Sequence, residues 1–390
     1  MASSPAQIAN AEGVAALRAG DAAAAVAAFA RATTADPAAG PLWRNLAHAH
    51  RLAGDAEGER TALNQALSID RRDFAAHLRL AQLHERLGEE TQALMAWSAV
   101  QQLAAAMPGL PPEVAAELAA GERYCEGLRA RLATAAEAAL AADAARDETE
   151  ERRVRAFVDQ ALGRRRVYHN QCAGVFYPFL PEDEYFDRRH FPWFDQLEAA
   201  TADIRSELQA LLDAPGDLIR PYVRFEEGTP ENEWSPLDGS LDWSACFLWE
   251  YGAPHQGVLD RCPKTAALLE RLPLARIPGR APNAFFSVLR PHSKIPPHTG
   301  VTNTRAIIHL ALEVPPGCGF RVGNETREWV EGKAFAFDDS IEHEAWNNSD
   351  QRRAVLIIDS WNPHLSAREQ DAVLRYFAAA DSALAGGGPR

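Results

Sequence analysis

Residues 333–346 read KAFAFDDSIEHEAW, and with PPHTG at residues 296–300 they decide how the second half of the chain folds. The run KAFAFDD has strand composition, and so do three others separated from it by turns rich in Pro or Gly: AFFSVLR (284–290), RAIIHLALEV (305–314) and RRAVLIIDSW (352–361). Several short strands over this length predict an antiparallel sandwich or barrel. One amphipathic stretch, residues 194–212, predicts a helix beside it.

Two histidines lie at the ends of these predicted strands. His298 precedes the strand 305–314, and His343 follows the strand 333–339. Histidines at strand ends in a barrel can converge on one ion, and imidazole suits Fe, Zn, Cu and Ni. The usual third ligand of a mononuclear iron oxygenase is a carboxylate, commonly two residues after the first histidine, where this chain has Gly300. Spacing alone therefore leaves the metal site incomplete and a structural role for both histidines open.

Longer motifs add a family resemblance. PPHTGVTNTR, HLALEVP, GNETREWVEGKAFAFDDSIEHEAWN and IIDSWNPHLS, in this order, closely resemble the aspartyl/asparaginyl β-hydroxylase family of Fe(II)- and 2-oxoglutarate-dependent oxygenases. The resemblance runs from about Cys262 to Val373, and more weakly back to Val167. It implies a double-stranded β-helix (jelly-roll) domain that uses Fe(II), 2-oxoglutarate and O2. It also implies two histidine ligands with glycine in place of the carboxylate.

The resemblance assigns roles to individual residues. His298 and His343 match the two iron ligands, and Arg353 matches the arginine that holds the distal carboxylate of 2-oxoglutarate. A planar guanidinium suits bidentate capture of a carboxylate. Ser287 matches a serine that assists at the same carboxylate, and His309 matches a histidine near the C1 carboxylate. A plain strand serine and a buried structural histidine remain the alternatives for the last two.

One position departs from the family pattern. Family members often carry an arginine two residues before the histidine that His309 matches, whereas this chain has Ile307. Arg305 shares a strand face with Ile307 but matches a family arginine of its own, so the role is not moved onto it. The sequence therefore does not predict how the C1 carboxylate is held beyond His309 and the metal.

Three further points stay open at the sequence level. The third metal ligand could be water or a nearby acid; the candidate acids are Asp338, Asp339, Glu342 and Glu344. Trp243 and Trp249 match a tryptophan-rich segment that lines the pocket in the family, but core packing is equally compatible with either. Arg352 faces away from Arg353 in a strand, which favours an exposed charge.

The first half of the chain is built differently. Residues 1–150 hold 47 alanines and only five aromatic residues, which predicts helix. Three sets of residues recur every 34 positions: Gly20, Gly54 and Gly88; Phe29, Leu63 and Trp97; Ala32, Ala66 and Val100. This period, with a glycine between amphipathic stretches, resembles tetratricopeptide repeats over about residues 7–103. An alanine-rich bundle is the alternative fold, and the hairpins could either hold a peptide or cap the second half.

Composition excludes several classes of function. A net charge of −14 disfavours nucleic acid as a partner. The five cysteines are scattered without CxxC pairs, which argues against a disulfide framework or a thiolate zinc site. The sequence shows neither a membrane span nor the features of a signal peptide, so we expect a cytoplasmic protein.

The sequence thus predicts a multidomain α plus β protein. We expect tetratricopeptide-like helical repeats at 1–106, a helical connector at 107–166, a jelly-roll domain at 167–378 and a flexible tail at 379–390. The expected reaction is hydroxylation of an unactivated C–H, with the β-carbon of Asp or Asn in a peptide or protein as first choice. A lipid acyl chain, a free amino acid, or a non-catalytic peptide-binding module are the alternatives. The sequence does not predict the oligomeric state.

Overall fold

The computed structural model describes residues 3–107, 109–141 and 146–385, and it divides the chain into two compact units, Met1–Arg146 and Asp147–Arg390. The division lies inside the segment 107–166. That segment is helical in both units, because α7 (Pro112–Ala141) belongs to the first and α8 (Glu148–Ala161) to the second. No helix in these described ranges has the length and apolar character needed to cross a membrane.

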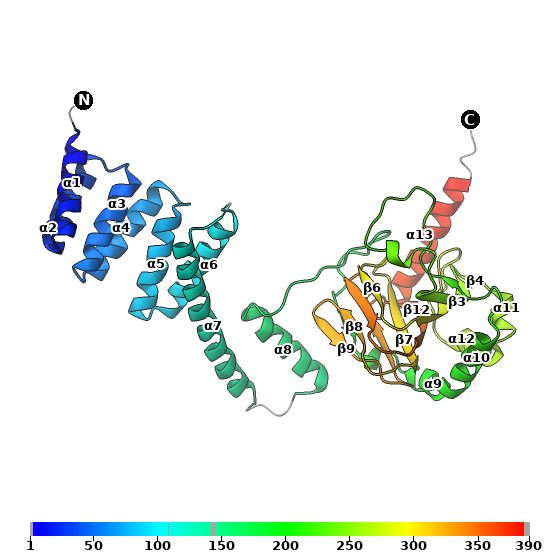
Figure 1. The fold of residues 1–390 in the computed structure, drawn as a ribbon. Helices are drawn as coiled ribbons and strands as arrows, with labels where there is room; N and C mark the ends of the chain where they lie inside the picture. The colour runs from blue at the N-terminus through cyan, green and yellow to red at the C-terminus, as the bar shows by residue number, and fades with distance from the viewer. Residues whose placement is uncertain (1–2, 108, 142–145, 386–390) are drawn as a thin grey trace, which may run out of the picture. The chain divides into compact units, whose positions relative to one another are not determined.

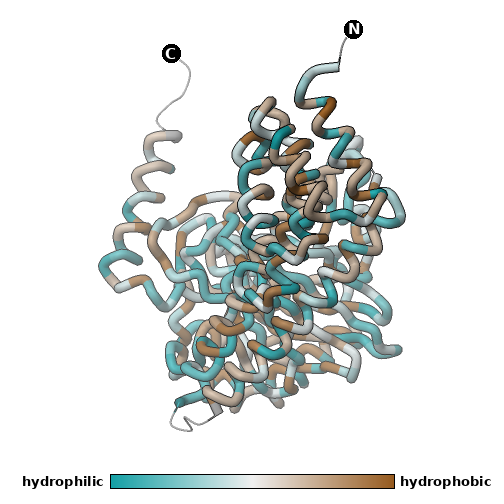
Figure 2. The backbone as a smooth tube through the Cα atoms, turned by 90° about the vertical axis from the view of Figure 1, so that its left-hand side faces the viewer, coloured by the Kyte–Doolittle hydropathy of each residue, from teal (hydrophilic) through white to brown (hydrophobic). Residues whose placement is uncertain are grey.

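The first unit begins with three helical hairpins, which confirms the predicted repeat (Figure 1). They are α1 (Pro5–Arg18) with α2 (Ala22–Ala35), α3 (Gly40–Leu52) with α4 (Ala56–Ile69), and α5 (Phe74–Leu87) with α6 (Glu90–Ala105). The turns contain Gly20, Gly54 and Gly88 at φ of 78°, 76° and 69°, a backbone conformation that favours glycine. Figure 2 shows hydrophobic and hydrophilic residues interspersed along these helices.

The repeated residues form the contacts between helices. The apolar side chains at the recurring positions are buried, and five of them are fully inaccessible: Phe29, Leu63, Ala32, Ala66 and Val100. Small residues at one position let the helices approach closely, and a bulky one at the other fills the space between them. The 34-residue period is therefore the packing period of this unit.

The second unit contains two antiparallel sheets, compatible with the predicted jelly roll. The larger has the order β1-β10-β7-β12-β5-β3-β2, with β4 beside β3, and the smaller has the order β6-β11-β8-β9. The strands of the larger sheet are β1 (Tyr185–Phe186), β2 (Arg220–Pro221), β3 (Trp243–Glu250), β4 (Ala253–Pro254), β5 (Ala284–Leu289), β7 (Arg305–Glu313), β10 (Ala334–Phe337) and β12 (Arg353–Trp361). Those of the smaller sheet are β6 (Ser293–His298), β8 (Cys318–Val322), β9 (Glu325–Arg327) and β11 (His343–Asn347).

Side chains alternate between the two faces of the larger sheet along its central strands, and each face packs into its own hydrophobic core. In β7, Ile308 and Leu310 pack with helices on the outer face of the larger sheet, whereas Ile307 and Ala311 pack on its inner face, between the sheets. The outer helices include α9 (Phe194–Ala199), α10 (Thr201–Asp213), α11 (Gln256–Leu259) and α12 (Pro263–Arg271). Because strand side chains alternate, every second residue of β3, β5, β7 and β12 faces the interior between the sheets.

The structure corrects two sequence-level expectations. The predicted helix 194–212 is two helices, α9 and α10, which meet at Ala200. The expected tail at 379–390 begins too early, because the helix α13 (Ala367–Ala385) continues through Ala385, and residues 386–390 lie outside the described ranges. Periodicity alone did not indicate either boundary.

Candidate functional site

His298 and His343 are direct neighbours across two strands. His298 ends β6 and His343 begins β11, and the two residues are paired in the antiparallel register of these strands. Their ring centroids are 4.0 Å apart. The structure thus brings together the two residues that the sequence singled out as metal ligands.

Both imidazole rings are oriented in the same way. The Nδ1 atom of His298 donates to the carbonyl of Pro296 at 2.8 Å, and Nδ1 of His343 donates to the carbonyl of Ile341 at 2.9 Å. A carbonyl can only accept, so each neutral ring carries its proton on Nδ1 and presents an unprotonated Nε2. Burial lowers the pKa of both histidines, that of His343 well below its ordinary value. Two neutral rings with free Nε2 lone pairs are suited to bind a metal ion.

The space beside Gly300 is filled by a carboxylate. A Cβ atom at position 300 would overlap the side chain of Asp339, and the backbone N–H of Gly300 donates to the carbonyl of Asp339 at 2.6 Å. Burial raises the pKa of Asp339 to about 8. Glycine at position 300 is therefore required by the packing of Asp339, which lines the same cavity as the two histidines.

The other candidate acids are engaged elsewhere. Asp338 accepts hydrogen bonds from Asn170 and Ser340. Glu342 and Glu344 form ion pairs with Arg321. Within the described residues, no group of three or more His, Cys, Asp or Glu side chains is arranged to hold a metal ion. The protein itself thus offers two imidazoles, with Asp339 as the only one of the four acids that lines the cavity.

We predict that Gly300→Ala destabilises the protein by about 1–3 kcal/mol, because the added methyl group must displace the Asp339 carboxylate. Thermal or chemical unfolding measures the effect. Gly257→Ala is the control, since a Cβ there meets only Leu218 at 3.4 Å. The double variant Gly300→Ala/Asp339→Ala should recover most of the loss; additive losses would contradict the proposed contact.

Arg353 is a buried cation with no anionic partner among the residues that the structure describes. Its side chain begins β12 and is 1% exposed. Among the described residues no carboxylate lies within ion-pair distance of it, its Nε has no hydrogen-bond partner, and its guanidinium lies 4.9 Å from the centre of the Trp329 ring. Burial lowers the pKa of Arg353 to about 10, so it remains charged at neutral pH. A charge buried in this way is suited to bind an anion.

Ser287 connects Arg353 to the aromatic wall of the cavity. Its hydroxyl oxygen accepts from Trp243 Nε1 at 3.1 Å and from Arg353 at 3.4 Å. A hydroxyl has two lone pairs and one proton, so its proton remains available for a bound acceptor. Trp243 therefore lines the cavity, whereas Trp249 packs in the outer core; the sequence had left both possibilities open for each.

His309 lies on the inner face of β7, and its buried Nδ1 has no hydrogen-bond partner in the described part of the chain. Burial, and to a lesser extent the charge of Arg353, hold its pKa well below the ordinary value. The ring is neutral and packs against four aromatic rings of β8, β10 and the segment that follows β9: Phe320, Trp329, Phe335 and Phe337. A neutral imidazole with an unpaired ring nitrogen can bond to a ligand in the cavity.

Position 307 presents an apolar side chain to the cavity. Ile307 lines it on the same strand face as Arg305 and His309. Arg305 also reaches the cavity wall but is bound to Asp359 at 2.5 Å, so its charge is already compensated. Arg352 points to the opposite side, as expected, although it pairs with Glu313 rather than being a free surface charge.

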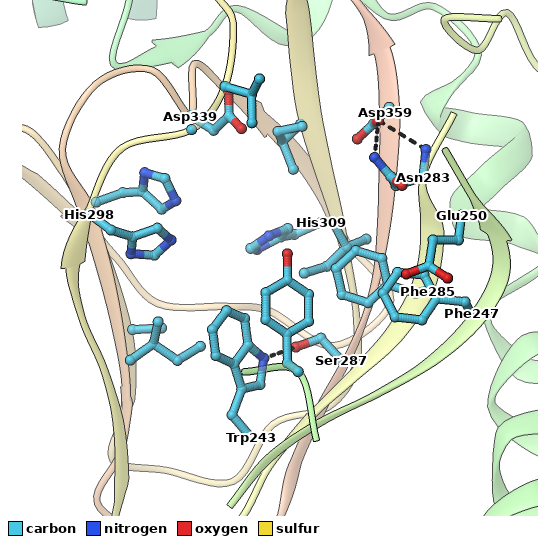
Figure 3. A pocket seen from close by; sticks show the side chains of 18 of the residues that line it. Trp243, Phe247, Glu250, Asn283, Phe285, Ser287, His298, His309, Asp339 and Asp359 are labelled. Carbon is cyan, nitrogen blue, oxygen red and sulfur yellow. Dashed lines mark hydrogen bonds between the residues drawn. The ribbon is translucent and has the colours of Figure 1, made fainter. Parts of the chain in front are cut away.

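One cavity of about 530 Å³ between the sheets is lined by the candidate site residues His298, His343, Arg353, Ser287 and His309, together with Trp243, Asp339, Ile307 and Arg305 (Figure 3). His298 lies on one side of it, His309 and Ser287 near the middle, and Asp359 with Asn283 on the opposite side. Sequence reasoning missed the aromatic wall of Tyr222, Phe247 and Phe285, which stack on one another. They come from separate segments with no shared motif, so only the sheet order brings them together.

Residues 198–363 match the family model described as aspartyl/asparaginyl beta-hydroxylase, and this range contains every cavity residue named above. Over these residues the C-terminal unit is similar to the aspartyl/asparaginyl β-hydroxylase family. The human protein named aspartyl/asparaginyl beta-hydroxylase is 39% identical over 184 residues, which are 46% of this chain and 24% of that protein. This chain therefore spans about a quarter of the length of that hydroxylase.

A second hydroxylase relative acts, by its name, on a different kind of molecule. The ornithine lipid ester-linked acyl 2-hydroxylase of Rhizobium tropici is 33% identical over 190 residues, 48% of this chain and 63% of that protein. For the helical hairpins, the first TPR of Spaghetti (RPAP3), solved with an HSP90 peptide, is similar at 19% identity and a TM-score of 0.28. It covers 31% of this chain and 94% of that structure. The hydroxylase family thus includes relatives named for two substrate classes.

Proposed function

We propose that the C-terminal unit is an Fe(II)- and 2-oxoglutarate-dependent dioxygenase that hydroxylates an unactivated C–H bond. The observation that carries the proposal is the pairing, in one cavity, of two metal-competent imidazoles with a buried arginine that has no counter-ion among the described residues. A carboxylate-bearing metal chelator satisfies both features at once. Neither feature alone would favour this function over a structural role.

The residues fit the implied groups. His298 and His343 would hold Fe(II) through their Nε2 atoms. Arg353 and the hydroxyl proton of Ser287 would bind the far carboxylate of 2-oxoglutarate, and His309 would bond to the carboxylate near the metal. Ile307 cannot add a charge at that end. His309 and the metal ion therefore carry this contact without an arginine.

Iron, 2-oxoglutarate and O2 together supply an oxidant able to hydroxylate a C–H bond, with succinate and CO2 as the other products. The contribution of this chain is to bind, orient and exclude water. The rings around His309 keep that end of the cavity dry, so its neutral imidazole and the charged Arg353 act in a medium of low dielectric constant. Asp339 lies beside the loop that follows His298 and, with its pKa raised to about 8, can hold a proton and donate a hydrogen bond there at neutral pH.

For the substrate, we propose the β-carbon of Asp or Asn in a peptide or protein, which is the activity named for the human and mouse relatives. A lipid acyl chain is the second candidate. It is favoured by the apolar cavity wall formed by Ile307, Phe285 and Ile357, and by the acyl hydroxylase relative. Both candidate substrates would use the same metal and cosubstrate residues. They differ in the part of the substrate that contacts the cavity wall.

An anaerobic titration tests the proposal directly. Fe(II) and 2-oxoglutarate added together should give a visible charge-transfer band that neither gives alone, and a chelator should remove it. Aerobic incubation with peptides containing Asp or Asn, and separately with acyl lipids, should then add the mass of one oxygen to one class. No band, with the protein folded by circular dichroism, would sink the proposal.

A further inference from the structure

A loop of residues 173–180, AGVFYPFL, exposes apolar side chains beside the cavity. Val175 is 39% exposed, Phe176 50% and Phe179 fully exposed. We call this segment the aromatic loop. Single exposed apolar residues are common on protein surfaces, but two phenylalanines and a valine within five residues form a patch that usually contacts something.

The aromatic loop is held firmly by the rest of the domain. The N–H groups of Ala173 and Gly174 donate to the carbonyls of Gly300 and Val301, at 3.1 and 2.9 Å. The backbone N–H and carbonyl of Tyr177 bond to the side chain of Asn303, at 2.7 and 2.9 Å. These bonds fix the loop on both sides of Phe176. Its apolar side chains are therefore presented to solvent by a defined backbone rather than exposed by fraying.

The backbone of Phe179 adopts a left-handed conformation. Its φ is 69°, in the left-handed region where a bulky side chain is strained and glycine is preferred. Because its ring is fully exposed, no burial within the described chain compensates for this strain. Strain together with exposure of an aromatic ring is the pattern expected of a residue kept for contact with another molecule.

The aromatic loop continues into the cavity wall. Gly174 packs against Val301, since a Cβ at position 174 would lie 2.8 Å from Val301 Cγ1. Val301 is half exposed and lines the cavity together with Gly300 and His298. The aromatic loop therefore begins against Val301, at the metal-binding side of the cavity, and exposes Val175, Phe176 and Phe179 in the residues that follow.

Three carboxylates lie near the aromatic loop. Glu369 accepts a hydrogen bond from Tyr177 Oη at 3.1 Å, and Glu182 and Asp183 follow Phe179 closely in the chain. Within the described residues, none of these three carboxylates forms an ion pair with an arginine or lysine. Glu182 pairs with His169 and accepts from the backbone N–H of Asn170, and Asp183 pairs with His364. An anionic lipid surface would be repelled by these groups, whereas lysine or arginine would be attracted.

We propose that the aromatic loop docks a peptide segment of the substrate in which an apolar side chain is flanked by lysine or arginine. Docking here places a neighbouring residue of the segment at the cavity beside His298. The peptide nature of the occupant rests on the proposed function, while the apolar and basic character rests on the loop itself. The loop is thus a specificity element outside the reacting site.

Peptide binding to the full chain, without metal, tests the proposal. Fluorescent peptides carry a central Asp and a leucine or tryptophan between lysines; matched peptides replace the apolar residue with glycine or the lysines with glutamates. Phe176→Ser and Phe179→Gly should each weaken binding of the first peptide about 10-fold. The exposed Leu132 on α7, in the first unit, provides the control variant Leu132→Ser, which should leave binding unchanged. Phe179→Gly should also raise the melting temperature, because glycine relieves the strained φ, so lost binding cannot reflect lost folding.

Two results would overturn the proposal. One is equal affinity of the basic peptide for the wild type and for Phe179→Gly. The other is Phe179-dependent sedimentation with vesicles of phosphatidylcholine and phosphatidylglycerol without peptide binding, which would make the surface a membrane contact. The proposed oxygenase function is tested separately, by the absorption band of Fe(II) with 2-oxoglutarate. Peptide binding without that band would contradict the oxygenase function but support the docking surface.

Discussion

Replacing His343 with alanine is expected to remove the Fe(II)–2-oxoglutarate absorption band and to lower turnover more than about 100-fold. Of the three imidazoles that line the described cavity, only His298 and His343 are paired with each other, so loss of one leaves a metal ion with a single ligand from this pair. Anaerobic absorption spectroscopy and metal analysis after gel filtration measure the loss. His298→Ala should behave in the same way, since the two residues pair across β6 and β11.

His292→Ala is the matched control for both histidine variants. His292 is the residue just before β6. It is largely exposed and pairs with Asp350 on the surface. Its replacement should leave the absorption band and metal content unchanged. Retention of the band in His343→Ala, with the far-ultraviolet circular dichroism of the wild type, would show that the metal is bound elsewhere.

Arg353→Met is expected to move cosubstrate affinity and stability in opposite directions. Removing the cation should weaken 2-oxoglutarate binding by about 2–5 kcal/mol, a factor of roughly 30 to several thousand. In the ligand-free protein the same change replaces an uncompensated buried charge with an apolar side chain of similar length, which should stabilise the fold by about 1–3 kcal/mol. Calorimetric titration and chemical denaturation measure the two effects on one sample.

Arg352→Met provides the control for Arg353→Met. Arg352 precedes Arg353, points to the outer face, and pairs with Glu313 and Gln209. Its loss should leave 2-oxoglutarate affinity unchanged and lower stability slightly or not at all. A stability loss in Arg353→Met together with normal 2-oxoglutarate affinity would mean that the arginine is structural.

The fold was predictable where a local rule set each element. A 34-residue recurrence located three hairpins, because each glycine is needed for a left-handed turn and each bulky residue for helix packing. The four long strands near the C-terminus were predicted within one or two residues of β5, β7, β10 and β12. The break at Ala200 and the end of α13 were not predictable, because they depend on which neighbours each helix packs against.

The site was predictable only as a set of residues, not as a geometry. His298, His343, Ser287, His309 and Arg353 all line one cavity, as the family resemblance implied. No spacing rule predicted that the Asp339 carboxylate fills the place of a side chain at Gly300, or that Asp359 neutralises Arg305. Both depend on contacts between strands far apart in sequence.

The orienting bonds of the two histidines have a consequence for substitutions in the cavity wall. Each ring is fixed by a carbonyl only two residues earlier in its own chain segment, Pro296 for His298 and Ile341 for His343. The wall that faces a substrate comes from other strands, including Ile307 and Phe285. Mutations in that wall can therefore change which molecule is accepted without reorienting the imidazoles. The orientation of the histidine pair is thus independent of the composition of that wall.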